Sequence, residues 1–194
     1  MTASLQAGLV RTKLAHEVPA DEWERWEFLR DSPLKDANTK ELQRAAGVIG
    51  QGTFLWIPGP PNRRARAFAE VALALCQREL KYRSDTDEFA KEEDIRGFTR
   101  TDDGPLAAVA RGADDCDEKA RLFVALCLAV GLSARMVPWW HPVNLTLDHV
   151  SAEVLLEEEG GGASWVHAEC ILRRAQLGEM ADDVPREANG KWLK

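Results

Sequence analysis

The sequence lacks an excess of positive charge, and this argues against one broad class of partner. Its 194 residues carry 25 Lys and Arg against 32 Asp and Glu, giving a formal net charge of −7 at pH 7. Nucleic-acid binding needs clustered Lys and Arg opposite the phosphates, so we expect no nucleic-acid partner. The one basic cluster, at residues 63–66, begins an expected helix and is interpreted as a solvated helix face.

Long apolar runs are also missing. The N-terminal residues lack the apolar core of a secretory signal. No segment of the sequence reaches the roughly 18 apolar residues of a membrane span. We therefore expect a cytoplasmic protein that does not associate with membranes.

Cysteine and histidine are scarce, with four of each in the chain. There is no CxxC pair, and no two of these residues have the spacing of a zinc site. The sequence therefore predicts reduced thiols and neither a metal nor a cofactor. It gives no indication of the oligomeric state.

What the sequence does contain is enough apolar material for a core, since 45% of its residues are hydrophobic. Residues 1–62 are expected to form a mostly helical extension, with a short helix at 19–29 and a second at 39–46 that ends at Gly47. Whether this extension braces the rest of the chain or covers it is left open. Residues 63–194 are expected to form the main domain, which starts with a long helix up to Lys81.

A loop followed by an apolar helix carries the first candidate for chemistry, Cys116. The helix is expected to start at an Asp cap, Asp114 or Asp115, and to end at Gly131. At a helix N-terminus, unpaired N–H groups and the helix dipole stabilise a thiolate and can hold an oxyanion. The adjacent acidic residues oppose a thiolate, so the hypothesis requires a histidinium against the sulfur. The alternative is an incidental cysteine at the start of a core helix.

Three segments after Gly131 have the alternation of strands, at residues 132–139, 147–156 and 164–170. In the second strand, Leu147 and His149 are expected on its more polar face. In the third, His167 and Glu169 share a face, and antiparallel pairing can bring Glu169 beside His149. A carboxylate there would fix the tautomer of the imidazole and stabilise the imidazolium. His167, and His141 in a loop, remain alternatives for the base.

The order of these segments resembles the transglutaminase-like superfamily, particularly its short bacterial and phage-associated members. The segments that carry the resemblance are Gly-Ala-Asp-Asp-Cys116-Asp-Glu-Lys-Ala, Val-Gly-Leu-Ser-Ala-Arg-Met-Val, Asp-His149-Val-Ser-Ala-Glu-Val and Trp165-Val-His-Ala-Glu169. It implies an α+β, papain-like fold in which a buried, cysteine-bearing helix packs on an antiparallel sheet. It also implies a Cys116–His149–Glu169 triad, with Glu169 in place of the commoner Asp.

Three aromatic residues are further candidates for the site. The resemblance puts Tyr82 where many members keep an aromatic residue near the cleft, for substrate binding or the oxyanion; a core role is the alternative. Trp139 and Trp140 can line a substrate cleft, contact a partner or pack in the core.

The expected chemistry is acyl transfer through a thioester on Cys116. Attack on a peptide bond or a Gln side-chain amide of a peptide or protein, followed by water, gives a cysteine peptidase or amidase. A Lys amine in place of water gives a transglutaminase, and fold cannot separate the two. The alternative from another class is a non-catalytic binding or structural module that keeps the fold.

Overall fold

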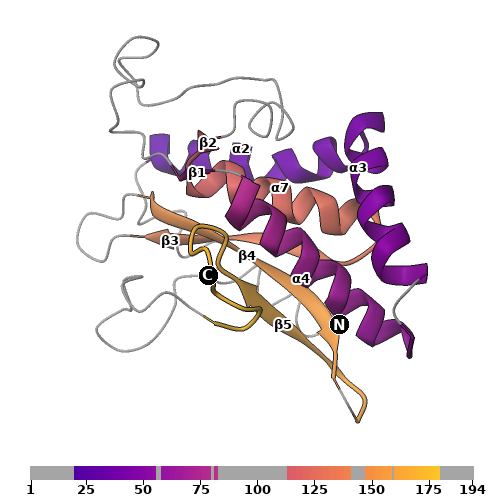
Figure 1. The fold of residues 1–194 in the computed structure, drawn as a ribbon. Coiled ribbons are helices and arrows are strands. Elements are labelled where there is room, and N and C mark those ends of the chain that lie inside the picture. The colour runs from indigo at the N-terminus through magenta and orange to yellow at the C-terminus, as the bar shows by residue number, and fades with distance from the viewer. Residues whose placement is uncertain are drawn as a thin grey trace.

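The computed structural model describes residues 20–55, 58–79, 81–82, 113–140, 147–158 and 160–179. Helices pack on a three-stranded antiparallel sheet, which is the α+β class predicted from the sequence (Figure 1). The helices are α2 (Ala20–Ala37), α3 (Lys40–Gly50) with the π-helical turn η1 (Gln51–Leu55), α4 (Pro61–Glu79) and α7 (Cys116–Ala129). The sheet has the order β3 (Ala134–Trp140), β4 (Leu147–Glu157) and β5 (Ala163–Ala168). Strands β1 (Lys81–Tyr82) and β2 (Ala113–Asp114) form a short parallel pair.

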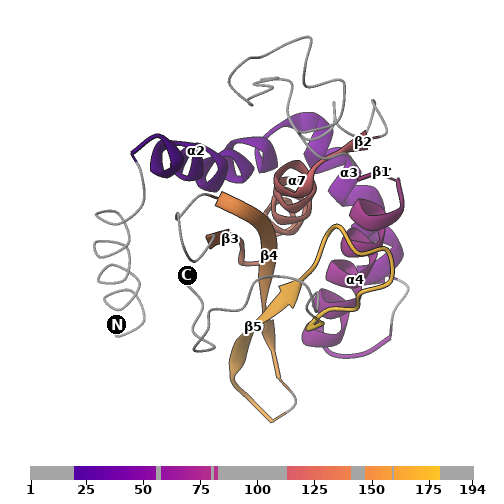
Figure 2. The ribbon, with the colours of Figure 1, turned by 90° about the vertical axis from the view of Figure 1, so that its left-hand side faces the viewer.

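Helix α7 lies at the centre, between the sheet and the other helices (Figure 2). All of its residues from Ala120 to Cys127 are buried, because apolar side chains surround almost its whole circumference. The side chain of Asp115 caps its start by accepting from the N–H of Glu118 at 3.4 Å. At its end, Gly131 has a φ of +81° and the backbone closes two overlapping turns that satisfy the last carbonyls. Both predicted ends of this helix are confirmed.

Helices α2 and α3 are longer than the sequence predicts. Helix α2 continues through Pro33, which cannot donate to the preceding turn, and the hydroxyl of Ser32 donates to the carbonyl of Phe28 at 2.6 Å. Helix α3 continues through Gly47 to Gly50. In both helices, burial of apolar residues in the common core outweighs the local preference to stop, which is about 1 kcal/mol for a glycine.

Helix α4 matches the predicted helix and presents an apolar stripe to the core. Phe68, Leu73 and Cys76 on this stripe are buried, whereas Val71 is 44% exposed. The polar Gln77 shares the buried side of α4 and is 4% exposed. Within the described residues, no helix is both long and apolar enough to span a membrane.

The strand β4 contains an irregularity close to its start. Trp139 pairs with His149, but Trp140 pairs with Leu147, so Asp148 is an extra residue in β4, a β-bulge. Leu147 packs against the core, and so does Val150, three residues later. The prediction that Leu147 shares a face with His149 was therefore wrong, because the bulge interrupts the alternation of side chains.

Strands β4 and β5 are joined by a glycine turn. Gly160, Gly161 and Gly162 all have positive φ values, which side chains with a Cβ rarely adopt. The N–H of Glu158 closes this turn by donating to the carbonyl of Gly162 at 3.0 Å. The turn lies at the far end of the sheet from the start of α7 (Figure 2).

Candidate active site

Cys116 is the first residue of α7 and differs from the other three cysteines in its exposure. Its side chain is half-buried, whereas Cys76, Cys127 and Cys170 are fully buried. Burial raises the pKa of Cys76 to about 12 and raises the pKa values of Cys127 and Cys170 well above the ordinary range. These three thiols are therefore held in the neutral, unreactive form, and Cys116 is the accessible one.

His149 lies on β4 and joins two partners from other elements. Its Nε2 is 3.0 Å from a carboxylate oxygen of Glu169, and the ring interacts with the side chain of Cys116. Because Nε2 is engaged by Glu169, Nδ1 is the ring nitrogen left for the sulfur. Burial of the ring disfavours its charged form, but the interactions with Cys116 and Glu169 outweigh this and raise the pKa of His149 to about 10. The site therefore favours an imidazolium at neutral pH.

Glu169 directly follows β5 and is completely buried. Burial disfavours its charge, but a hydrogen bond with His149, the nearby His167 and a hydrogen bond from the N–H of Ile171 lower its pKa to about 2. Its backbone is fixed from α4, because the side-chain amide of Gln77 donates to the carbonyls of Glu169 at 3.0 Å and Ala175 at 2.9 Å. The carboxylate is thus ionised and held in one place.

The three residues of the predicted triad come together in the structure. Cys116 comes from α7, His149 from β4 and Glu169 from just after β5; His149 is hydrogen-bonded to Glu169 and interacts with Cys116. A thiol beside an imidazolium that a buried carboxylate orients can act as a nucleophile, and the same imidazolium can protonate a leaving group. Cys116 is the first residue of α7, and backbone N–H groups at a helix start can stabilise an oxyanion.

His167 occupies the other side of the same carboxylate. Its Nε2 is 3.8 Å from Glu169, which is too long for a hydrogen bond, and it has no other partner within the described part of the chain. Its ring packs at a steep angle to that of Trp139, with centroids 6.0 Å apart. The interaction with Cys116 distinguishes His149 from His167 as the candidate base. His141 lies outside the described residues.

The predicted aromatic candidates are placed differently from one another. Trp140 is part of the core and stacks on Trp23 of α2, with ring centroids 6.4 Å apart. Trp139 is on the opposite face of the sheet and 6% exposed, and its indole N–H donates to the hydroxyl of Ser151 at 2.7 Å. Both tryptophans therefore have packing roles. The side chain of Tyr82 lies outside the description, so its role stays a prediction.

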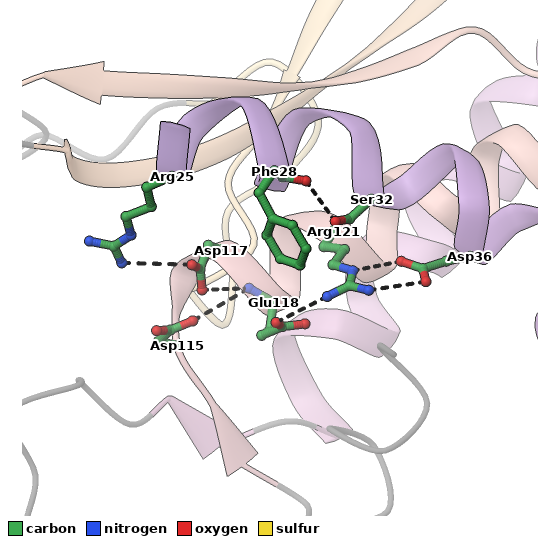
Figure 3. Close-up of polar contacts among 8 residues, drawn as sticks. All are labelled: Arg25, Phe28, Ser32, Asp36, Asp115, Asp117, Glu118 and Arg121. Carbon is green, nitrogen blue, oxygen red and sulfur yellow. Dashed lines mark hydrogen bonds and ion pairs between the residues drawn. The ribbon is translucent and has the colours of Figure 1, made fainter. Parts of the chain in front are cut away.

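The acidic residues around Cys116 are paired with groups of α2 and α7 (Figure 3). The carboxylate of Asp117 is 3.8 Å from the guanidinium of Arg25, and Arg121 forms ion pairs with Asp36 at 2.6 Å and with Glu118 at 3.3 Å. Two of the acidic residues that oppose a thiolate in the sequence, Asp117 and Glu118, are thus partly compensated by arginines.

Gln77 and Arg25, which contact Glu169 and Asp117 without belonging to the triad, were not predicted from the sequence. Gln77 had a usable signal, since it is a polar residue next to Cys76 on a helix whose apolar stripe was recognised. Arg25 had none, because it is one of many charged residues on α2. The described residues contain no group of three His, Cys, Asp or Glu that could hold a metal ion.

Comparison with known proteins gives a family and one similar fold. Residues 66–170, just over half of the chain, match the family described as the transglutaminase-like superfamily. No curated protein sequence matches the chain. A solved structure of a candidate cysteine protease from Cytophaga hutchinsonii is similar over 70% of this chain, with 18% sequence identity and a TM-score of 0.39. The chain spans 38% of that protein's length.

Proposed function

Because the chain belongs to the transglutaminase-like superfamily, we propose that it is a cysteine-dependent peptidase or amidase with a Cys116–His149–Glu169 triad. The observation that carries this proposal is the arrangement in which His149 interacts with the half-buried Cys116 and is hydrogen-bonded to the buried carboxylate of Glu169. The substrate class is a peptide bond or a Gln side-chain amide of a peptide or protein.

The reaction proceeds in two halves. The sulfur of Cys116 attacks the amide carbonyl, and N–H groups at the start of α7 stabilise the oxyanion. His149 gives its proton to the leaving amine, so a thioester forms and the amine departs. His149, now neutral, accepts a proton from water, which attacks the thioester and releases the acid together with the thiol. Glu169 keeps the imidazole oriented and its charged form stable throughout.

The first test is the rate at which iodoacetamide labels each cysteine of the native protein between about pH 5 and 9, mapped by mass spectrometry. We expect Cys116 to be labelled first, and its rate at pH 6 to fall when His149 is replaced by Ala. The matched control is His167→Ala, which removes a histidine from the same carboxylate but not from the sulfur. Equal rates in the wild type and in His149→Ala would contradict the triad.

A second test separates the possible acceptors. Peptides that contain Gln are incubated with the protein, with and without a primary amine, and the products are weighed by mass spectrometry. Release of an acid or a shorter peptide supports hydrolysis, and incorporation of the amine supports a transglutaminase instead. Cys116→Ala is the control in each case. A reactive Cys116 with no turnover of any peptide would favour a binding module.

A further inference from the structure

One turn of α2, residues 22–25, contacts both elements that supply the reacting side chains. This turn precedes the part of the chain that matches the family, residues 66–170. The start of β4 lies beside α2 and close to the first turn of α7 (Figure 2). The contacts on the two sides involve different residues and can be considered in turn.

On the side of α7, the turn contacts the residue that directly follows the nucleophile. Arg25 and Asp117 form an ion pair at 3.8 Å, with their side chains 22% and 12% exposed (Figure 3). The other oxygen of Asp117 accepts from the N–H of Glu118 at 2.9 Å. Asp117 therefore links the first turn of α7 to α2, while its charge is shared between a guanidinium and a backbone donor.

On the side of the sheet, the turn contacts the strand of His149 just before that residue. The carboxylate of Glu22 accepts a hydrogen bond from the N–H of Leu147 at 3.1 Å. The neighbouring Trp23 stacks on Trp140, which pairs with Leu147 across the bulge. The position of Leu147 is thereby fixed by a charged acceptor and by two stacked rings.

We propose that residues 22–25 form a positioning element that sets the distance between Cys116 and His149. A single helical turn is a rigid spacer, and here one face of it is bonded one residue after the sulfur and two residues before the imidazole. A hydrogen bond between thiol and imidazole depends on this distance, and a displacement of about 1 Å can cost roughly 100-fold in rate. This inference rests on the proposed function, since it assigns the geometry of that same pair.

The test measures the rate of Cys116 labelling at pH 6 in the full-length protein. Glu22→Ala and Arg25→Ala are each expected to lower it about tenfold. Glu22→Gln, whose amide oxygen can still accept from Leu147, and Arg25→Lys, which keeps the charge, are expected to recover most of the rate. Glu24→Ala is the matched control, because Glu24 lies in the same turn but faces solvent.

Folding is monitored in the same sample by the buried Cys127, which is labelled only when the protein unfolds. A variant that slows Cys116 while Cys127 stays protected has lost positioning and not stability. If Glu22→Ala and Arg25→Ala slow Cys116 no more than Glu24→Ala, or if slowing occurs only with exposure of Cys127, the positioning role is overturned while the proposed function stands. If His149→Ala leaves the wild-type rate unchanged, the proposed function fails and the positioning role with it.

Discussion

The first turn of α7 and the body of the helix are held in place in different ways. Its first turn, Cys116–Lys119, is held by a cap, by an ion pair to α2 and by the interaction of Cys116 with His149. Its body, Ala120–Cys127, is held almost entirely by apolar packing, with Arg121 as the charged exception. Packing is roughly proportional to buried area and has little direction, whereas hydrogen bonds and ion pairs fix distance and angle. The body of the helix thus supplies stability, and its first turn supplies geometry.

The largest effect expected from this difference is on activity. Cys116→Ala removes the proposed nucleophile, so amide turnover is expected to fall at least about 1,000-fold with little change in the free energy of unfolding. Cys127→Ala, eleven residues further along the same helix, is expected to keep turnover in the folded protein and lose stability. Peptide turnover and thermal unfolding of both variants check this. A Cys127→Ala protein that folds but does not turn over peptide would contradict this division between the first turn and the body of the helix.

The next largest effect is expected on the free energy of unfolding, from a substitution in the body of the helix. Phe123 is fully buried, so Phe123→Ala is expected to cost about 3–5 kcal/mol in the free energy of unfolding, measured with urea. At urea concentrations where it stays folded, its Cys116 should keep the wild-type labelling rate. Leu34, which is 63% exposed, gives the control: Leu34→Ala should change stability by at most about 0.5 kcal/mol.

A smaller effect is expected from the ion pair that joins α2 to the body of α7. Asp36→Ala leaves Arg121 buried with Glu118 as its remaining partner, which is expected to cost about 2–3 kcal/mol in urea unfolding. Asp31→Ala removes a partner of Arg30 that is 59% exposed and should cost at most about 0.5 kcal/mol. Equal losses of unfolding free energy in the two variants would mean that burial of the Arg121–Asp36 pair has no effect on what its removal costs.

The smallest change expected is a shift in the pKa of His149, the partner of the first turn. Glu169 helps to hold the pKa of His149 near 10, so Glu169→Gln is expected to lower the pKa of His149 by at least about one unit. NMR titration of the ring measures this directly. A pKa unchanged in Glu169→Gln would mean that Cys116 alone stabilises the imidazolium.

The same shift has a defined effect on stability. The pKa of His149 is raised in the folded protein to about 10, above the value of about 6.5 for an unfolded chain. Its contribution to the free energy of unfolding is therefore complete below about pH 6.5 and is lost as the pH rises toward 10. In Glu169→Gln this loss should be smaller and finish at a lower pH. Urea unfolding at a series of pH values, with Asp31→Ala as control, checks this.

Much of this arrangement could be predicted from the sequence because it follows from local pattern. The apolar run after Cys116 and the glycine at 131 define α7, and strict alternation defines most of β4. These patterns place Cys116 at a helix start and put His149 and Glu169 on facing strands. Their hydrogen-bonded arrangement follows from the fold that the ordered segments suggested.

Other features depend on contacts between distant residues and leave no local pattern. Helix α2 passes through Pro33 because its buried face packs on α7, although a proline ordinarily ends a helix. Arg121 is buried because Asp36, 85 residues earlier, meets it. The sequence gives the residue types of such pairs but not which acid meets which base.

The bulge at Asp148 makes side-chain orientation at the start of β4 depend on the exact number of residues there. Leu147, before the bulge, packs on the core and donates a hydrogen bond to α2, and His149, after it, is hydrogen-bonded to the carboxylate of Glu169. Adding or removing one residue here would exchange the two sides of the strand on which these residues lie. The glycine turn at 160–162 carries no such constraint. Insertion scanning should therefore find two kinds of site within one strand pair: a tip that accepts a tag, and a start that tolerates substitution but not a change of length.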